Sequence, residues 1–174
     1  MSKNSPSRKR VVFLARAAVI AALYAGLTLA LPMLSYGSSG GIELRFAEAL
    51  TLLPVLTPAA IPGLAAGCVL ANLGSPFGLV DIVFGSLASL LAALCAYWLR
   101  GVQLKRLPWL SALMPVLWNG VVVGAILACM LFDSFTWANM LVMGGQVALS
   151  ELLVCCALGL PLVALLRKTK LFQE

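Results

Sequence analysis

The sequence contains no histidine, and only 10% of its 174 residues are charged. Without histidine, the chain can form neither a Ser-His-Asp triad nor a histidine-ligated metal site nor a histidine proton relay. No lysine follows a glycine, so the phosphate-binding loop of ATPases is missing as well. We therefore expect no enzymatic activity, no cofactor, and no ability to drive transport with nucleotide unaided.

Polar surface is also scarce, because 62% of the residues are hydrophobic and the mean hydropathy is +1.04. A water-soluble globule of this size needs more polar residues than that. Apolar runs of about twenty residues, each long enough to cross the hydrocarbon layer as a helix, occur at 11–34, 79–99, 109–132 and 139–166. The composition predicts an all-α integral membrane protein in contact with the lipid bilayer.

Neither the cysteines nor the positive charge indicates another class of protein. All five cysteines lie in apolar segments without CxxC spacing, so we interpret them as small packing residues. They are Cys68, Cys95, Cys129, Cys155 and Cys156. The net charge of +6 lies in short segments that flank the apolar runs. Such charges orient membrane helices, and we expect no nucleic-acid partner.

The basic residues fall into three groups, at 3–16, 100–106 and 167–170. The positive-inside rule assigns all three groups, and with them both termini, to the cytoplasm. If the segment 46–73 crossed the membrane once, the middle group would follow three crossings and lie outside. The segment must therefore cross twice or turn back.

Two prolines, Pro58 and Pro62, support a turn within this segment because proline interrupts helical hydrogen bonding. We predict two short helices at about 45–57 and 61–73, and hence six transmembrane helices of which the second and third are short and interrupted by proline. They belong to a single membrane domain, 11–166, between cytoplasmic tails at 1–10 and 167–174. Short interrupted helices of this kind in transporters tend to lie near the binding site.

Acidic side chains inside the predicted spans call for an explanation, because one at the centre of a helix costs about 2.5–3.5 kcal/mol on insertion scales. Glu151 lies deepest, and it can accept hydrogen bonds from a ligand or bond across helices as a buried carboxyl. Asp81 is either a ligand contact or a helix-start residue favoured by the helix dipole. Glu48 lies three residues after Arg45, and the two can pair with each other or form the polar lip of a pocket.

Other polar or aromatic residues in the spans also allow two interpretations. Asn72 is a ligand contact or a polar group at a helix end. Trp118 and Asn119 can stack on and bond a flat heterocycle, or face lipid and pack internally. Gln146 shares a helix face with Ser150 that can line the same cavity as Glu151, although Gln146 and Glu151 point in different directions.

Small residues form two ridges on the first helix, and such ridges let a second helix approach closely. One ridge contains Ala17, Ala21 and Ala25, and the other contains Ala18, Ala22 and Gly26. A G-x-x-x-G pattern at Gly120 and Gly124 has the same property. Each of these surfaces either contacts a partner subunit or packs within the bundle.

The segment 43–93, ELRFAEALTLLPVLTPAAIPGLAAGCVLANLGSPFGLVDIVFGSLASLLAA, resembles the queuosine-precursor transporter family (QueT type). Members of this family are the substrate-specificity (S) subunits of energy-coupling factor (ECF) transporters. The segment 15–28, ARAAVIAALYAGLT, is similar to their first helix. The remainder of the chain, from Arg100 onward, is generic.

The resemblance implies a six-helix subunit in a bacterial cell membrane that captures a vitamin-like molecule from outside. It implies as ligand a 7-deazapurine precursor of queuosine, such as preQ0, preQ1 or queuine, and as partners a transmembrane coupling subunit and two cytoplasmic ATPases. The alanine ridges would contact the coupling subunit, and the outer loop at 35–42 would gate the site. The candidate ligand contacts are Glu48, Glu151, Asp81, Asn72, Asn119, Gln146, Trp118 and Arg45.

Two other functions remain open from the sequence. A self-sufficient carrier or channel would use one of the buried carboxylates to couple transport of a small molecule to an ion gradient. A membrane scaffold would bind no small molecule.

Overall fold

The computed structural model describes residues 6–36, 44–132 and 135–169. Within these ranges the chain forms helices and one isolated β-bridge, with no strand. Four helical segments are long and apolar enough to cross a membrane, namely Pro6–Ala30, Asp81–Gly101, Trp109–Leu131 and Trp137–Leu166. They coincide with the four predicted apolar spans, and the prediction of an all-α membrane protein is confirmed to this extent.

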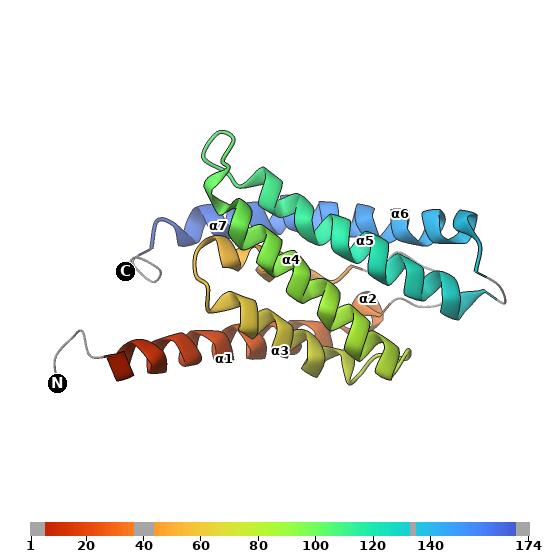
Figure 1. Cartoon of the computed structure of the whole chain (residues 1–174), viewed down its shortest axis with the longest axis horizontal. Coiled ribbons are helices and arrows are strands. Elements are labelled where there is room, and N and C mark those ends of the chain that lie inside the picture. The colour runs from red at the N-terminus through yellow and green to blue at the C-terminus, as the bar shows by residue number, and fades with distance from the viewer. Residues whose placement is uncertain (1–5, 37–43, 133–134, 170–174) are drawn as a thin grey trace.

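The elements follow one another as an array of helices that run back and forth along the longest axis (Figure 1). They are α1 (Pro6–Ala30), α2 (Pro32–Ser35), η1 (Phe46–Val55), α3 (Ala60–Asn72), η2 (Asp81–Gly85), α4 (Ser86–Trp98), η3 (Leu99–Gly101), α5 (Trp109–Leu131), α6 (Trp137–Val154), η4 (Cys155–Gly159) and α7 (Leu160–Leu166). The segments η2 and η4 are π-helical turns inside longer helices.

The ambiguous segment 46–73 forms two short helices, η1 and α3, whose ends lie within two residues of the predicted bounds. The chain turns back between them at the end of the bundle where both termini lie (Figure 1). In contrast to the prediction, η1 is a 3-10 helix, and Pro54 inside it has no N–H to donate. Because a 3-10 helix rises about 2.0 Å per residue, its ten residues reach roughly 20 Å.

The described parts of the three basic groups lie at one end of the bundle. One Nη of Arg167 donates to Gln103 Oε1 at 3.1 Å and to the Arg106 carbonyl at 2.8 Å, which ties the end of α7 to the loop after η3. The start of α1 is at the same end (Figure 1). This arrangement agrees with an even number of membrane crossings between one basic group and the next, as the positive-inside rule requires.

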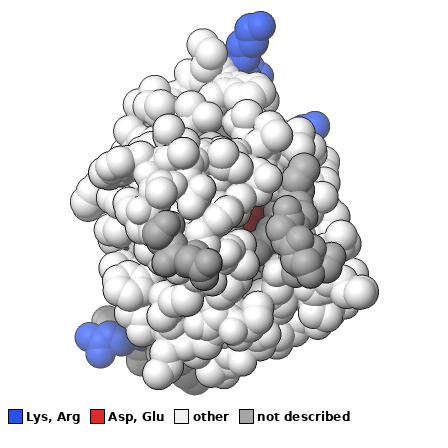
Figure 2. Space-filling model, turned by 90° about the vertical axis from the view of Figure 1, so that its right-hand side faces the viewer, with Lys and Arg blue, Asp and Glu red and all other residues white. Residues whose placement is uncertain are grey.

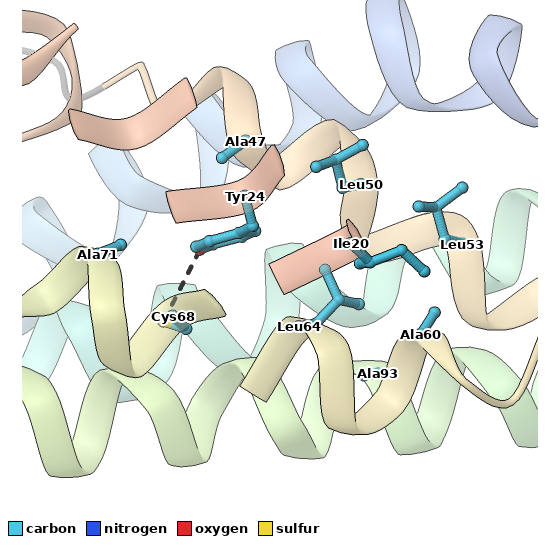
Figure 3. Packing of buried hydrophobic residues seen from close by; sticks show 10 residues of the cluster. All are labelled: Ile20, Tyr24, Ala47, Leu50, Leu53, Ala60, Leu64, Cys68, Ala71 and Ala93. Carbon is cyan, nitrogen blue, oxygen red and sulfur yellow. Dashed lines mark hydrogen bonds between the residues drawn. The ribbon is translucent and has the colours of Figure 1, made fainter. Parts of the chain in front are cut away.

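The first helix packs against α3 through small residues. A Cβ on Gly63 would lie 2.7 Å from the Ala17 carbonyl oxygen, and one on Gly67 would lie 2.9 Å from that of Ala21. The ridge with Ala25 therefore packs inside the bundle. The core beside it contains Ile20, Tyr24, Leu64 and Cys68 (Figure 3). The second ridge, with Ala18, Ala22 and Gly26, is exposed.

The G-x-x-x-G pattern of α5 also packs internally, against α6. A Cβ on Gly144 would lie 2.6 Å from the Gly120 carbonyl oxygen, and one on Gly124 would overlap the Gly144 Cα. The two helix backbones can approach this closely only because no side chain separates them.

Substitution of Gly144 by alanine is expected to lower the free energy of unfolding by about 1–3 kcal/mol, because the added methyl group would overpack the α5–α6 contact. The neighbouring Gly145 is the matched control, since a Cβ there meets nothing within 4 Å. Gly145→Ala should leave stability unchanged or raise it slightly. Thermal unfolding in detergent measures both, and equal stability of the two variants would contradict this packing.

Candidate functional site

Buried polar side chains gather where η1, α5 and α6 meet. The amide Nδ2 of Asn119 in α5 donates to Glu151 Oε1 in α6 at 2.8 Å. Both side chains are nearly inaccessible, with 3% and 6% of the residue surface exposed. The structure thus unites two of the predicted site residues across the α5–α6 interface.

A small cavity of about 20 Å³ lies beside this pair. It is lined by Arg45, Asn119, Val123, Val147, Ser150, Glu151 and Val154. The residues from α6 lie at i, i+3, i+4 and i+7, which is one helix face. The cavity has room for about one water molecule, and the Ser150 hydroxyl is buried without a hydrogen-bond partner.

Seen from the end away from the termini, the molecule is almost uncharged on its described surface (Figure 2). Acidic colour shows only in a recess near the centre of this view, and lysine and arginine show only at its edges. An acidic group at this end is therefore set back from the surface.

Glu48 is brought to the same region by the geometry of η1. A 3-10 helix has three residues per turn, so Arg45, Glu48 and Thr51 follow one another along one face. The Thr51 hydroxyl donates to the Glu48 carbonyl at 2.5 Å. The Cys155 thiol lies 3.8 Å from that carbonyl and 3.9 Å from Glu151 Oε2, which connects η1 with the last span.

Tyr24 of α1 is a site neighbour that the sequence analysis missed. Its hydroxyl donates to Glu48 Oε1 and lies 3.8 Å from the Cys68 sulfur, the contact drawn in Figure 3. The other oxygen of Glu48, Oε2, is buried and has no hydrogen-bond partner. In the sequence, Tyr24 could have been noticed as a single tyrosine in an alanine-rich helix.

Arg45 forms its described ion pair with Asp81, at 3.5 Å, and not with Glu48. A direct ion pair between Arg45 and Glu48, which their spacing allows, is not among the described contacts. Arg45 Nε also donates to the Ser35 carbonyl at 2.9 Å, and its guanidinium lies 5.7 Å from the Tyr36 ring centre. These contacts hold the cation at the rim of the cavity.

Asp81 and Asn72 form a structural link next to this rim. Asn72 Nδ2 donates to the Asp81 carbonyl at 2.8 Å, which ties α3 to η2. Gly85 is needed here, because a Cβ at this position would lie 2.9 Å from Asn72 Nδ2 and 3.0 Å from Asp81 Oδ1. Cys68 belongs to the same cluster, 3.3 Å from the Ser89 hydroxyl and 3.5 Å from Asn72 Nδ2. Neither Asn72 nor Asp81 lines the cavity.

Two further candidates lie outside the cavity lining. Trp118 is half-buried, and its Nε1 is buried without a hydrogen-bond partner. Gln146 is half-buried and is not among the lining residues. Of the predicted outer gate at 35–42, Ser35 and Tyr36 are described, and the Tyr36 hydroxyl donates to the Ala71 carbonyl at 2.5 Å. The remainder of that loop lies outside the described residues.

Comparison with known proteins gives one family. The family model described as QueT transporter matches residues 14–168. No curated protein and no solved structure matches the chain.

Proposed function

Since the chain belongs to the QueT transporter family, we propose that it is the substrate-binding subunit of an ATP-driven ECF uptake system. Its long apolar helices are those of a membrane protein. Its ligand would be a 7-deazapurine precursor of queuosine taken up from outside. The observation that carries this proposal is the burial of Glu48, Asn119 and Glu151 inside the bundle, with Asn119 bonded to Glu151.

The chemistry of the ligand matches these groups. The guanine-like edge of a 7-deazaguanine presents adjacent N–H donors, and a carboxylate accepts such a pair with its two oxygens. Glu151 would accept this edge, and the Asn119 amide would bond a neighbouring polar atom. Glu48 is not among the residues that line the cavity, and its unpartnered Oε2 would supply a second acceptor once the cavity widens for the ligand.

Charge favours ligands that carry an amine. Three acidic residues, Glu48, Glu151 and Asp81, are buried near the cavity. Among the described lining residues the cation is Arg45, which pairs with Asp81. Burial alone favours the neutral form of a carboxyl group, and a cationic ligand would stabilise the charged form. Coulomb attraction between the two charges is strong in a region with little water. We therefore expect aminomethyl-deazaguanine (preQ1) to bind more tightly than the neutral nitrile preQ0.

The ligand needs more room than the cavity of about 20 Å³ provides. A bicyclic base would enter only after the valine walls on α5 and α6, among them Val123 and Val147, move away from Arg45. Such gating is common in proteins that enclose small molecules.

In this proposal all six segments cross the bacterial cell membrane, with the basic end and both termini in the cytoplasm. Residues 11–166 form the single membrane domain. The chain has no nucleotide-binding loop, so a coupling subunit and two ATPases would supply the energy. The ridge of Ala18, Ala22 and Gly26 is exposed and consists of small residues, so a partner helix could approach α1 closely there.

Leucine at both Ala18 and Ala22 is expected to lower ATP-driven uptake at least about tenfold, because bulky side chains would prevent close approach of a partner helix. Ligand binding by the purified chain should not change, since both residues are exposed and neither lines the cavity. Ala138→Leu, at an exposed alanine of α6, is the matched control. Normal uptake by the double variant would show that this ridge does not contact the coupling subunit.

Buried carboxylates also allow the alternative of a carrier coupled to an ion gradient. Reconstitution of the chain alone in liposomes separates the two functions. The proposal predicts no concentrative uptake of preQ1 under a proton or sodium gradient, and uptake only when the coupling subunit, the ATPases and ATP are supplied. Concentrative uptake by the chain alone would exclude the ATP-driven assignment.

A further inference from the structure

We propose that Tyr24 is a positioning residue of the ligand site, whose hydroxyl holds one oxygen of Glu48 and leaves the other for the ligand. This inference rests on the proposed function, because it assigns a role within the same site. It adds a residue from α1, an element that contributes nothing to the cavity lining.

The geometry fixes Tyr24 firmly. The residue is 1% exposed, and its ring lies in the core formed by α1, η1 and α3 (Figure 3). Its Cβ approaches Gly67 so closely that a Cβ at Gly67 would lie 2.9 Å away. A side chain packed in this way has little freedom, so its hydroxyl is held at one point.

The Tyr24 hydroxyl bonds the carboxyl group of Glu48, whose two oxygens differ in their hydrogen bonding. Glu48 Oε1 accepts the bond from Tyr24, whereas Oε2 is buried with no hydrogen-bond partner. A buried acceptor without a partner is costly, and it is found in folded proteins mainly where a function requires it. Because Tyr24 holds Oε1, the orientation of the carboxyl group is restricted. Oε2 is left without a partner behind the present cavity lining, where a ligand N–H could reach it once the cavity widens.

A carboxylate oriented in advance binds more tightly than one that must be ordered by the ligand. Without the Tyr24 hydroxyl, Glu48 would rotate and would lose the defined direction of Oε2. The Tyr24 hydroxyl itself would not touch the ligand. The effect of Tyr24 on binding must therefore act through Glu48, and this makes the inference testable by a double-mutant cycle.

The experiment is a binding titration of the purified full chain with preQ1, using Tyr24→Phe, Glu48→Met and the double variant. Tyr24→Phe keeps the ring and should weaken binding about tenfold, the effect of one hydrogen bond to a charged group. Methionine keeps the length of the side chain but has no oxygen to accept the Tyr24 hydroxyl. In the Glu48→Met background the loss of that hydroxyl should therefore alter affinity less than about twofold. Glu48→Leu gives a second cycle if the methionine variant does not fold.

Thr28→Val is the matched control. Thr28 lies one turn further along α1, is also 1% exposed, and donates its hydroxyl to the Tyr24 carbonyl without contacting Glu48. Its loss should leave affinity within about twofold. Equal effects of Tyr24→Phe in both backgrounds, with wild-type binding intact, would overturn the role of Tyr24 alone. Absence of binding by the wild type would instead overturn the proposed function, and the role of Tyr24 with it.

Discussion

Replacement of Glu151 by glutamine is expected to weaken preQ1 binding by roughly 100-fold, which is the loss of about two charge-assisted hydrogen bonds. Glu151 lies inside the long helical segment Trp137–Leu166, where an acidic side chain is costly to insert. The Asn119 amide occupies Oε1, at 2.8 Å, and fixes the direction of the carboxyl group. Isothermal titration calorimetry of the purified variant measures the effect.

The same substitution should not destabilise the fold. Glutamine keeps the size of the side chain and can still bond the Asn119 amide, while the cost of burying a carboxyl group disappears. We expect the thermal stability of Glu151→Gln to equal or exceed that of the wild type. Gln146→Leu, on the same helix and outside the cavity lining, is the control and should bind normally. Unchanged affinity of Glu151→Gln would show that the ligand lies elsewhere.

Removal of the Arg45 guanidinium, as in Arg45→Met, is expected to lower the free energy of unfolding by about 3–5 kcal/mol. The Asp81 side chain is only 2% exposed, and its described ion-pair partner is Arg45 at 3.5 Å. Without this cation a carboxylate remains buried and uncompensated. Arg45 also connects the cavity with Ser35, so ligand binding should decline together with stability.

A second substitution distinguishes loss of the ion pair from loss of packing. Asp81→Leu in the Arg45→Met background removes the remaining charge and should recover much of the stability. Arg100→Met is the control, because the Arg100 guanidinium stacks on Tyr97 at 3.8 Å at the opposite end of the bundle. Its cost should be about 1 kcal/mol or less. A double variant as unstable as Arg45→Met would contradict a role for the Asp81 charge.

The helical segments could be predicted because their signals are local. Hydropathy marked the four long spans, and the prolines near residue 60 marked the turn between η1 and α3. The 3-10 form of η1 and the π-helical turns at Asp81–Gly85 and Cys155–Gly159 were not predicted. These departures from regular α-helix depend on packing between elements that are distant in sequence, as the Gly159 contact with η1 illustrates.

The site could be predicted only in part, for a related reason. The cost of an acidic group in the membrane made Glu48 and Glu151 candidates, and the structure buries both. Sequence spacing could not show that Arg45 pairs with Asp81, 36 residues away. Nor could it show that Tyr24 contacts Glu48 across two helices.

The two alanine ridges were indistinguishable in sequence, and only the packing of α3 separates them. Gly63 and Gly67 of α3 pack against Ala17 and Ala21, and this contact buries the first ridge. The spacing of these two glycines is itself a G-x-x-x-G pattern that could have indicated an internal contact.

The most direct test of the account is a titration of the purified protein in detergent with preQ1, preQ0, queuine, guanine and several vitamins. The account predicts saturable binding at one site, tightest for a deazapurine with an amine, and much weaker or absent binding of guanine and the vitamins. If no deazapurine binds, or if a vitamin binds more tightly than every deazapurine, the assignment of Glu48, Asn119 and Glu151 as a deazapurine site is wrong.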